Sequence, residues 1–215
     1  QGIGEASKYL NFPVVSGNVS FYNQTKEIGI KPTPSIGGVG LIKDYKKMIT
    51  MNLKEVDNLI LIIGKTEGHI DQSLFARTIL DENKGPPPEV NLFNEKNNGE
   101  SLLNLIEKDL IQSAHDVSLG GIITAISKMC IKGNKGINLK TPKNLINKIE
   151  YLFAEDQGRY IVEINPNDMK EVSKILIKNS VHYEELGIII DSEMVINEKT
   201  KVTIDELKSY NSNWL

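Results

Sequence analysis

Beyond residue 58, apolar residues recur in patterns that are typical of strands and helices. The run Leu59–Ile63 is apolar throughout and is followed by Gly64, which predicts a buried strand over 58–64. The 3.6-residue apolar period predicts helices over 101–112 and 122–131. Further helices are expected over 1–10, 73–80, 142–152 and 168–178, and further strands over 113–117, 136–140, 159–164 and 185–191. This interleaving predicts an α+β fold, a layered sheet with helices on a face.

The first part of the chain has a different pattern. Phe12–Val15 is short and β-branched, which favours a strand, and the polar stretch 23–27 predicts a hairpin loop. Prolines and glycines crowd the segment 30–42 and exclude a helix there. The chain becomes polar and charged near 43–53, so we expect one domain over 1–53 and a second over 54–215.

Composition excludes several classes of protein. Hydrophobic residues make up 40% and charged residues 25% of the 215 residues, the balance of a soluble globular protein. The net charge is −3 and no long Lys/Arg cluster occurs, which argues against nucleic-acid binding. No apolar run approaches the roughly 20 residues that span a bilayer. The one cysteine, Cys130, fits a reducing compartment, and we expect the cytoplasm.

The stretch Ser16-Gly17-Asn18-Val19-Ser20 is the first candidate for chemistry. Glycine lets a bulky anionic ligand approach the backbone, and an asparagine amide oxygen is a hard ligand suited to Mg²⁺. In a strand, Asn18 and Ser20 would point to the same face. A bulged strand with a turn-forming asparagine explains the same spacing without any function.

Three blocks, in this order, resemble formylglycinamide ribonucleotide amidotransferases. The first is Pro13–Asn23, followed by Lys31–Gly40. The second, Ser113–Gly121, resembles the family motif Ala-His-Asp-Val-Ser-Asp-Gly-Gly. The third, Leu152–Arg159, resembles Leu-Phe-Gly-Glu-Ser-Gln-Gly-Arg, and the final 213–215 resembles the usual end of the family's chains.

The resemblance implies a fold and a reaction. Residues 1–53 would be the tail of a core domain and 54–215 an outer domain, both like those of aminoimidazole ribonucleotide (AIR) synthetase. The family is a ligase of purine biosynthesis that uses ATP, Mg²⁺ and ammonia from glutamine to aminate formylglycinamide ribonucleotide. Its expected partners are a glutaminase subunit and a small accessory subunit. The first ten residues resemble a helix already under way, so we expect a piece of a longer chain.

The family's site roles carry over to three residues. Gly17 would lie against ATP, Asn18 would bind Mg²⁺ and Ser20 would contact the ribonucleotide substrate. The family's catalytic histidine and acidic metal ligands lie upstream of the matched region. The resemblance therefore places no catalytic residue in these 215 residues and predicts that they are inactive alone.

Other chemical candidates favour structural roles. His115 and Asp116 are adjacent on an extended segment and should point apart, with Asp116 capping the next loop. Leu119 replaces a motif aspartate, which argues against a second metal site. Glu155–Arg159 is expected to be structural, with Arg159 pairing locally.

Two glycine-containing segments and two further side chains are the last candidates for ligand binding or catalysis. Gly64-Lys65-Thr66 lacks the first glycine of a P-loop, because Leu59 stands there. The segment 68–73 resembles a family Gly-X-Leu-Gly-Gly-Ser loop but has Asp71 in place of a glycine, which argues against an auxiliary nucleotide site. Cys130 and His182 are expected to be inert.

Two alternatives stay open. The chain could be a non-catalytic half kept for folding and docking, or part of another ATP-using enzyme of the superfamily: AIR synthetase, thiamine-phosphate kinase or selenophosphate synthetase.

Overall fold

The computed structural model describes residues 1–143 and 147–212 and divides into two compact units. Unit 1 is 1–46 and unit 2 is 47–215. Residues 47–53 pack with unit 2, where Thr50 bridges Ser113 and Leu53 is buried in the core. The assignment of 1–53 and 54–215 to two domains of a family stays a prediction. The predicted resemblance at 213–215 lies outside the described residues.

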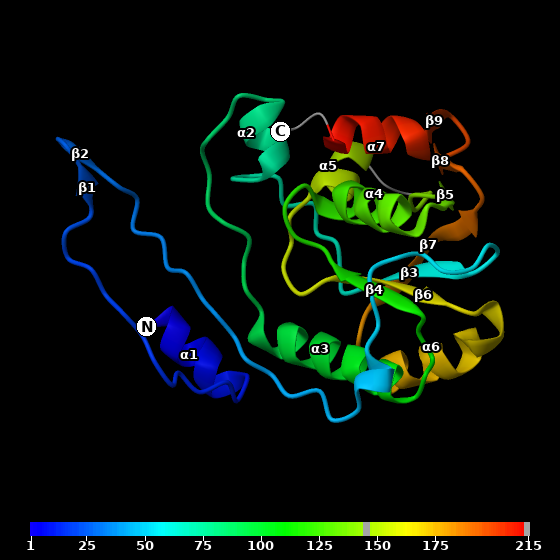
Figure 1. The fold of residues 1–215 in the computed structure, drawn as a ribbon, viewed down its shortest axis with the longest axis horizontal. Helices are drawn as coiled ribbons and strands as arrows, with labels where there is room; N and C mark the ends of the chain where they lie inside the picture. Colours follow the sequence, from blue (N-terminus) through cyan, green and yellow to red (C-terminus); the bar gives the residue numbers. More distant parts are fainter. Residues whose placement is uncertain (144–146, 213–215) are drawn as a thin grey trace. The chain divides into compact units, whose positions relative to one another are not determined.

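Unit 1 has little regular structure. Helix α1 spans Gly2–Tyr9, and strands β1 (Gln24–Thr25) and β2 (Ile28–Gly29) form an antiparallel hairpin (Figure 1). The predicted hairpin loop at 23–27 overlaps this turn. The short 3₁₀ helix η1, Tyr45–Lys47, follows.

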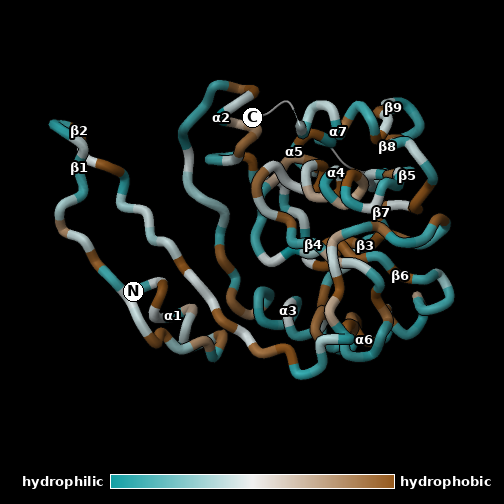
Figure 2. Tube along the Cα trace, in the orientation of Figure 1, coloured by the Kyte–Doolittle hydropathy of each residue, from teal (hydrophilic) through white to brown (hydrophobic). Residues whose placement is uncertain are grey.

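The predicted strand at Phe12–Val15 is wrong. No regular structure spans 11–22, and Val15 and Phe21 are 92% and 97% exposed. A strand needs a neighbouring strand for its backbone hydrogen bonds, and the described part of unit 1 offers none to this segment. Figure 2 shows apolar stretches recurring along this sparsely structured part of the chain.

Unit 2 is built on a seven-stranded sheet with the order β4-β6-β3-β7-β5-β8-β9. All neighbouring pairs are antiparallel except β5 with β8. The strands are β3 (Leu59–Ile63), β4 (Ser113–Asp116), β5 (Gly136–Leu139), β6 (Tyr160–Ile164), β7 (Tyr183–Ile190), β8 (Glu193–Ile196) and β9 (Thr200–Thr203). The α+β class expected from the sequence is confirmed.

Helices cover both faces of this sheet (Figure 1). Helices α4 (Gly121–Gly133), α5 (Lys148–Phe153) and α7 (Ile204–Ser212) contribute to one core. Helices α3 (Leu92–Glu107) and α6 (Met169–Lys178) contribute to the other. Strand β3 lies between them: Ile60 and Ile62 enter the first core, Leu61 and Ile63 the second. Burial on both faces explains why this strand is apolar at every position.

Helix α4 ends at Gly133, two residues beyond the predicted end at 131. A Cβ on Gly133 would lie 2.5 Å from the backbone oxygen of Leu53. The left-handed conformation that closes the helix is adopted by Asn134, with φ of 51°. Glycine is therefore needed for close packing, and asparagine makes the turn.

Several predicted boundaries were wrong. Helix α3 begins at Leu92, nine residues before the predicted start at 101, because its first turns are polar and lack apolar periodicity. Helix α2 (Leu74–Thr78) lies inside the predicted 73–80, and α5 is shorter than the predicted 142–152, of which 144–146 lie outside the described residues. The 3₁₀ helix η2 (Pro166–Asp168) precedes α6, and Asn165 caps the start of η2.

Among the described residues, no helix is long and apolar enough to cross a membrane. Cys130 is fully buried on α4, and burial raises the pKa of its thiol to about 12. The thiolate needed for nucleophilic chemistry is therefore almost absent at neutral pH, in accord with an inert cysteine.

Candidate functional site

The predicted ligand residues of unit 1 lie together on an exposed segment. Gly17, Asn18 and Ser20 are all exposed, and no atom lies within 4 Å of the position that a Cβ on Gly17 would take. The side-chain amide of Asn23 donates a hydrogen bond to the backbone oxygen of Ser20. Asn18 and Ser20 are not on a strand, so the predicted common strand face does not exist here.

This segment fits a metal ligand only in part. Asn18 offers one neutral amide oxygen to solvent, and a divalent ion needs further oxygen ligands. In the described residues, no group of three or more His, Cys, Asp or Glu side chains is placed to hold a metal ion. Asn18 alone therefore does not make a metal site in the described residues.

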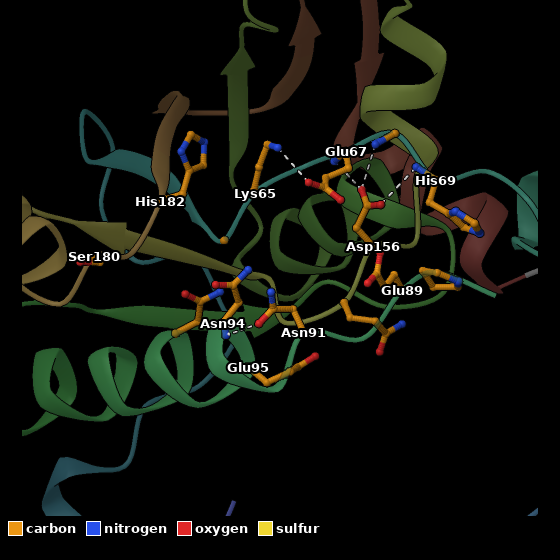
Figure 3. A pocket seen from close by; sticks show the side chains of 15 residues that line it. Lys65, Glu67, His69, Glu89, Asn91, Asn94, Glu95, Asp156, Ser180 and His182 are labelled. Atoms are coloured by element: carbon orange, nitrogen blue, oxygen red, sulfur yellow. Dashed lines mark hydrogen bonds and ion pairs between the residues drawn. The ribbon is translucent and has the colours of Figure 1, made fainter. Parts of the chain in front are cut away.

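Unit 2 contains a separate polar pocket with a volume of about 620 Å³. Figure 3 shows its walls: the loop after β3, the first turns of α3, and the segments around Asp156 and His182. The side chains that line it include four carboxylates and one lysine: Glu67, Glu89, Glu95, Asp156 and Lys65. Lys65 forms an ion pair with Glu67 at 2.8 Å.

Asp156 fixes the loop after β3. Its carboxylate accepts hydrogen bonds from the backbone N–H groups of Glu67 (2.9 Å), Gly68 (3.1 Å) and His69 (3.1 Å). The residue is 8% exposed. Three charge-assisted hydrogen bonds therefore tie the loop to one buried carboxylate.

Arg159 also holds the loop after β3, through hydrogen bonds that its guanidinium donates. Its guanidinium is buried and donates to the backbone oxygens of Asp156 (3.1 Å) and Ala154 (2.7 Å) and to the hydroxyl of Thr66 (2.9 Å). Burial lowers the pKa of Arg159, and the nearby carboxylate of Asp156 opposes that shift. The expectation that Arg159 pairs locally is confirmed.

Glu155 has a matching role on the other side. One oxygen accepts from the backbone N–H groups of Leu74 (2.7 Å) and Gly120 (2.8 Å). It thereby joins the start of α2 to the start of α4. The prediction that Asp116 caps the loop before α4 was wrong, because the described acceptor of Gly120 is Glu155.

Helix α3 presents a polar face to the pocket. Asn91 caps the helix by accepting from the N–H of Asn94, and Asn98 donates to the backbone oxygen of Gly158 at 2.8 Å. Glu95 lies between them, half-buried, and burial raises the pKa of its carboxyl group. Sequence reasoning missed Glu95 and Asn98, because a run of polar residues gave no helical period there.

His115 and Asp116 do face each other, contrary to the prediction. The Nδ1 of His115 lies 3.0 Å from a carboxylate oxygen of Asp116. Asp116 ends strand β4, so its side chain is free of the strict alternation inside a strand. The Nε2 of His115 is buried and has no hydrogen-bond partner in the described structure.

His182 lines the pocket but is engaged elsewhere. Its Nε2 lies 2.9 Å from Glu184, whose other carboxylate oxygen accepts from the hydroxyl of Tyr151 at 2.7 Å. Burial raises the pKa of Tyr151, so this hydroxyl stays protonated as a donor.

The comparison with protein families matches residues 55–197 to the C-terminal domain of AIR synthase related protein. The match covers more than half of the chain. The chain belongs to the AIR synthase related family.

Two curated relatives of this AIR synthase related chain share one name. It is 69% identical over all 215 residues to the phosphoribosylformylglycinamidine synthase subunit PurL of Pelagibacter ubique, and 40% identical over 217 aligned residues to that of Bartonella henselae. The chain spans 30% and 29% of the length of these two relatives.

Solved structures share the fold of the AIR synthase related chain. Thermotoga maritima PurL complexed with FGAR matches with a TM-score of 0.63 and 21% identity, over 76% of this chain and 30% of that one. The structure of PurLQS from the same organism matches with a TM-score of 0.61 and 19% identity, over 76% of this chain and 28% of that one. At these identities, the likeness supports the fold alone.

Proposed function

We propose that the chain is the C-terminal part of the synthetase subunit of phosphoribosylformylglycinamidine synthase, a cytoplasmic ligase of purine biosynthesis. The observation that carries the proposal is the 69% identity, over the whole chain, to a curated PurL subunit. The chain spans under a third of that relative, so the activity belongs to a longer protein.

The proposed reaction forms one carbon–nitrogen bond. ATP transfers its terminal phosphoryl group to the amide oxygen of formylglycinamide ribonucleotide, giving an iminophosphate and ADP. Ammonia, released from glutamine, then attacks the activated carbon, and phosphate leaves. Phosphoryl transfer of this kind needs positioned cations more than covalent help from the protein.

Within this reaction, the chain would contribute ligand contacts. Gly17 would let the ATP phosphates approach the backbone, and Ser20 would donate a hydrogen bond to the ribonucleotide. Asn18 would add a neutral oxygen to the shell of Mg²⁺, which neutralises phosphate charge when bound. All three residues are exposed, which leaves them available to a ligand that other parts of the protein also hold.

The exposed apolar side chains of unit 1 support the view that it is completed elsewhere. Val15, Val19 and Phe21 flank the proposed ligand residues and are each at least 74% exposed. Apolar side chains gathered in this way mark a surface that another part of a protein covers. We propose that the remainder of the synthetase covers it and supplies the catalytic histidine and acidic metal ligands.

The proposed partners are a glutaminase subunit, which would supply ammonia, and a small accessory subunit. The support is indirect: a solved relative is described as PurLQS, a name that joins PurL with two further components.

A chimera tests this function directly. The chain replaces the corresponding segment of the Pelagibacter ubique subunit, and product is measured with ammonia, ATP and formylglycinamide ribonucleotide. We expect the chimera to form product and the 215-residue chain alone to form none. A folded chimera without activity would overturn the assignment, and product from the chain alone would overturn the proposed division of the site.

A further inference from the structure

The loop after β3 has the geometry of an anion-binding site. The N–H groups of three successive residues, Glu67, Gly68 and His69, converge on one carboxylate at 2.9 to 3.1 Å. Successive N–H groups that point to one side form a concavity that binds anions. Gly68 has φ of +88°, a left-handed conformation that favours glycine and turns the backbone toward the carboxylate.

We propose that residues 67–69 form an anion-binding loop whose anion is supplied internally by Asp156, which closes the adjoining pocket to phosphate groups. Asp156 is then the residue that determines specificity in this pocket. When its carboxylate is removed, the loop should accept an external anion of the phosphate class.

The charges around the loop support this closure. Glu67, Glu89 and Glu95 line the pocket with Asp156, and the one lysine, Lys65, is already paired with Glu67. The two histidines of the wall have their Nε2 atoms occupied, one by the backbone oxygen of Pro86 at 3.0 Å and one by Glu184. A phosphate approaching the native pocket would meet carboxylates and find the N–H groups already used.

Asp156→Ser is the change that would reopen the loop. Serine is shorter and neutral, so it would leave the three N–H groups open. Arg159 would stay behind the loop, held by Thr66 and Ala154, and its charge would favour the incoming anion.

The test compares Asp156→Ser with the native chain in phosphate and in chloride at equal ionic strength. The native melting temperature should not depend on the choice of salt. Asp156→Ser should melt below the native chain in chloride and recover in phosphate, by roughly 5–10 °C at about 100 times its dissociation constant. Titration calorimetry with inorganic phosphate should give one site in this variant and none in the native chain.

Two control variants separate the loss of negative charge from the loss of the oxygen that occupies the loop. Asp156→Asn removes the charge but keeps an oxygen in the loop, and Asp71→Asn removes an exposed charge nearby. Neither should bind phosphate. Phosphate binding by Asp71→Asn or by the native chain would overturn the proposal.

Folding of the variant does not weaken the test. An Asp156→Ser chain that is unfolded in chloride and folded in phosphate supports the proposal. A folded Asp156→Ser chain that ignores phosphate would overturn it. So would a chain that stays unfolded in both salts while Asp156→Asn folds, because the loop would then accept no external anion. All these outcomes are independent of the synthase reaction.

Discussion

Units 1 and 2 differ in how much of their apolar side chains is exposed and in whether their polar groups are paired. In unit 1, Val15 and Phe21 are almost fully exposed, and so are the proposed ligand residues between them. In unit 2, strand β3 is buried on both faces, and the carboxylates of Glu155, Asp156 and Glu163 are directed at N–H groups of the same chain. Unit 2 has two buried apolar cores and pairs its buried carboxylates internally, whereas unit 1 leaves most of its apolar side chains exposed.

The largest expected effect comes from placing one carboxylate at a buried valine of unit 2 and another at an exposed valine of unit 1. Val162→Asp puts a carboxylate at a fully buried position of β6 and should cost more than about 4 kcal/mol, enough to abolish cooperative unfolding. The matched Val15→Asp should change stability by less than about 0.5 kcal/mol in this chain. Urea unfolding followed by circular dichroism measures both, and equal losses would break the comparison.

In the chimera, the same Val15→Asp change tests whether the remainder of the protein covers Val15. There we expect lower activity or stability, because Val15 should be covered by the remainder of the protein. Activity and stability equal to those of the unmodified chimera would argue against such a contact.

The next effect concerns a buried carboxylate. Glu163 accepts from the backbone N–H groups of Lys54 and Glu55, from the amide of Asn58 and from the hydroxyl of Ser113, at 2.8 to 3.0 Å. Glu163→Ala leaves these donors unsatisfied and should cost at least about 3 kcal/mol of unfolding free energy.

The control for this variant is Glu193→Ala on strand β8. Glu193 is partly exposed and its ion pair with Lys201 is 3.6 Å long, so the loss should stay below about 1 kcal/mol. Equal losses in the two variants would show that the Glu163 network does not anchor the start of unit 2.

A smaller effect is expected at the start of α2. Ser73 is buried and its hydroxyl oxygen accepts from the N–H of Ala76 at 3.1 Å. Ser73→Ala should cost about 1 kcal/mol, the usual value for a lost helix cap. The control Ser173→Ala, within α6, should change stability little or raise it slightly, and thermal unfolding compares the two.

The smallest expected effect depends on pH. Burial raises the pKa of Glu95 in the folded state, so the ionised carboxylate destabilises the fold above that pKa. Glu95→Gln should therefore raise stability at pH 7, by less than about 1 kcal/mol because the group is partly exposed. The gain should vanish as pH falls below the unfolded value of about 4.3.

Unfolding free energies at several pH values measure this effect. Glu100→Gln, an exposed change on the same helix, is the control and should show no such gain. A destabilised Glu95→Gln at pH 7 would mean that the pocket holds this carboxylate favourably.

The sequence predicted the central elements of unit 2 because burial leaves a pattern. Leu59–Ile63 is apolar at every position because both faces of β3 are covered, and the stripe of α4 follows from its one buried face. Helix α3 was placed late because its first turns face the polar pocket. The strand predicted at Phe12–Val15 failed because β-branched residues need a partner strand, which the described chain does not offer.

The candidate sites show the same limit. The local pairing of Arg159 was predicted correctly. The motif itself does not reveal that Asp156 accepts hydrogen bonds from three N–H groups of a loop 87 to 89 residues away. Contacts of that kind follow from the order of strands, which one sequence does not specify. The roles of Gly17, Asn18 and Ser20 rest on resemblance and stay predictions.

The most direct measurement of the central claim is the Mg²⁺ and ATP dependence of Asn18→Ala in the chimera, with Gln24→Ala as an exposed amide control from the same unit. Because even outer-shell metal contacts are worth about 10–100-fold, we expect kcat/KM for Mg·ATP to fall at least about tenfold in Asn18→Ala, and excess Mg²⁺ to restore part of it. Gln24→Ala should match the unmodified chimera. Unchanged kinetics in Asn18→Ala would contradict the claim that unit 1 carries part of the synthase's metal and nucleotide site.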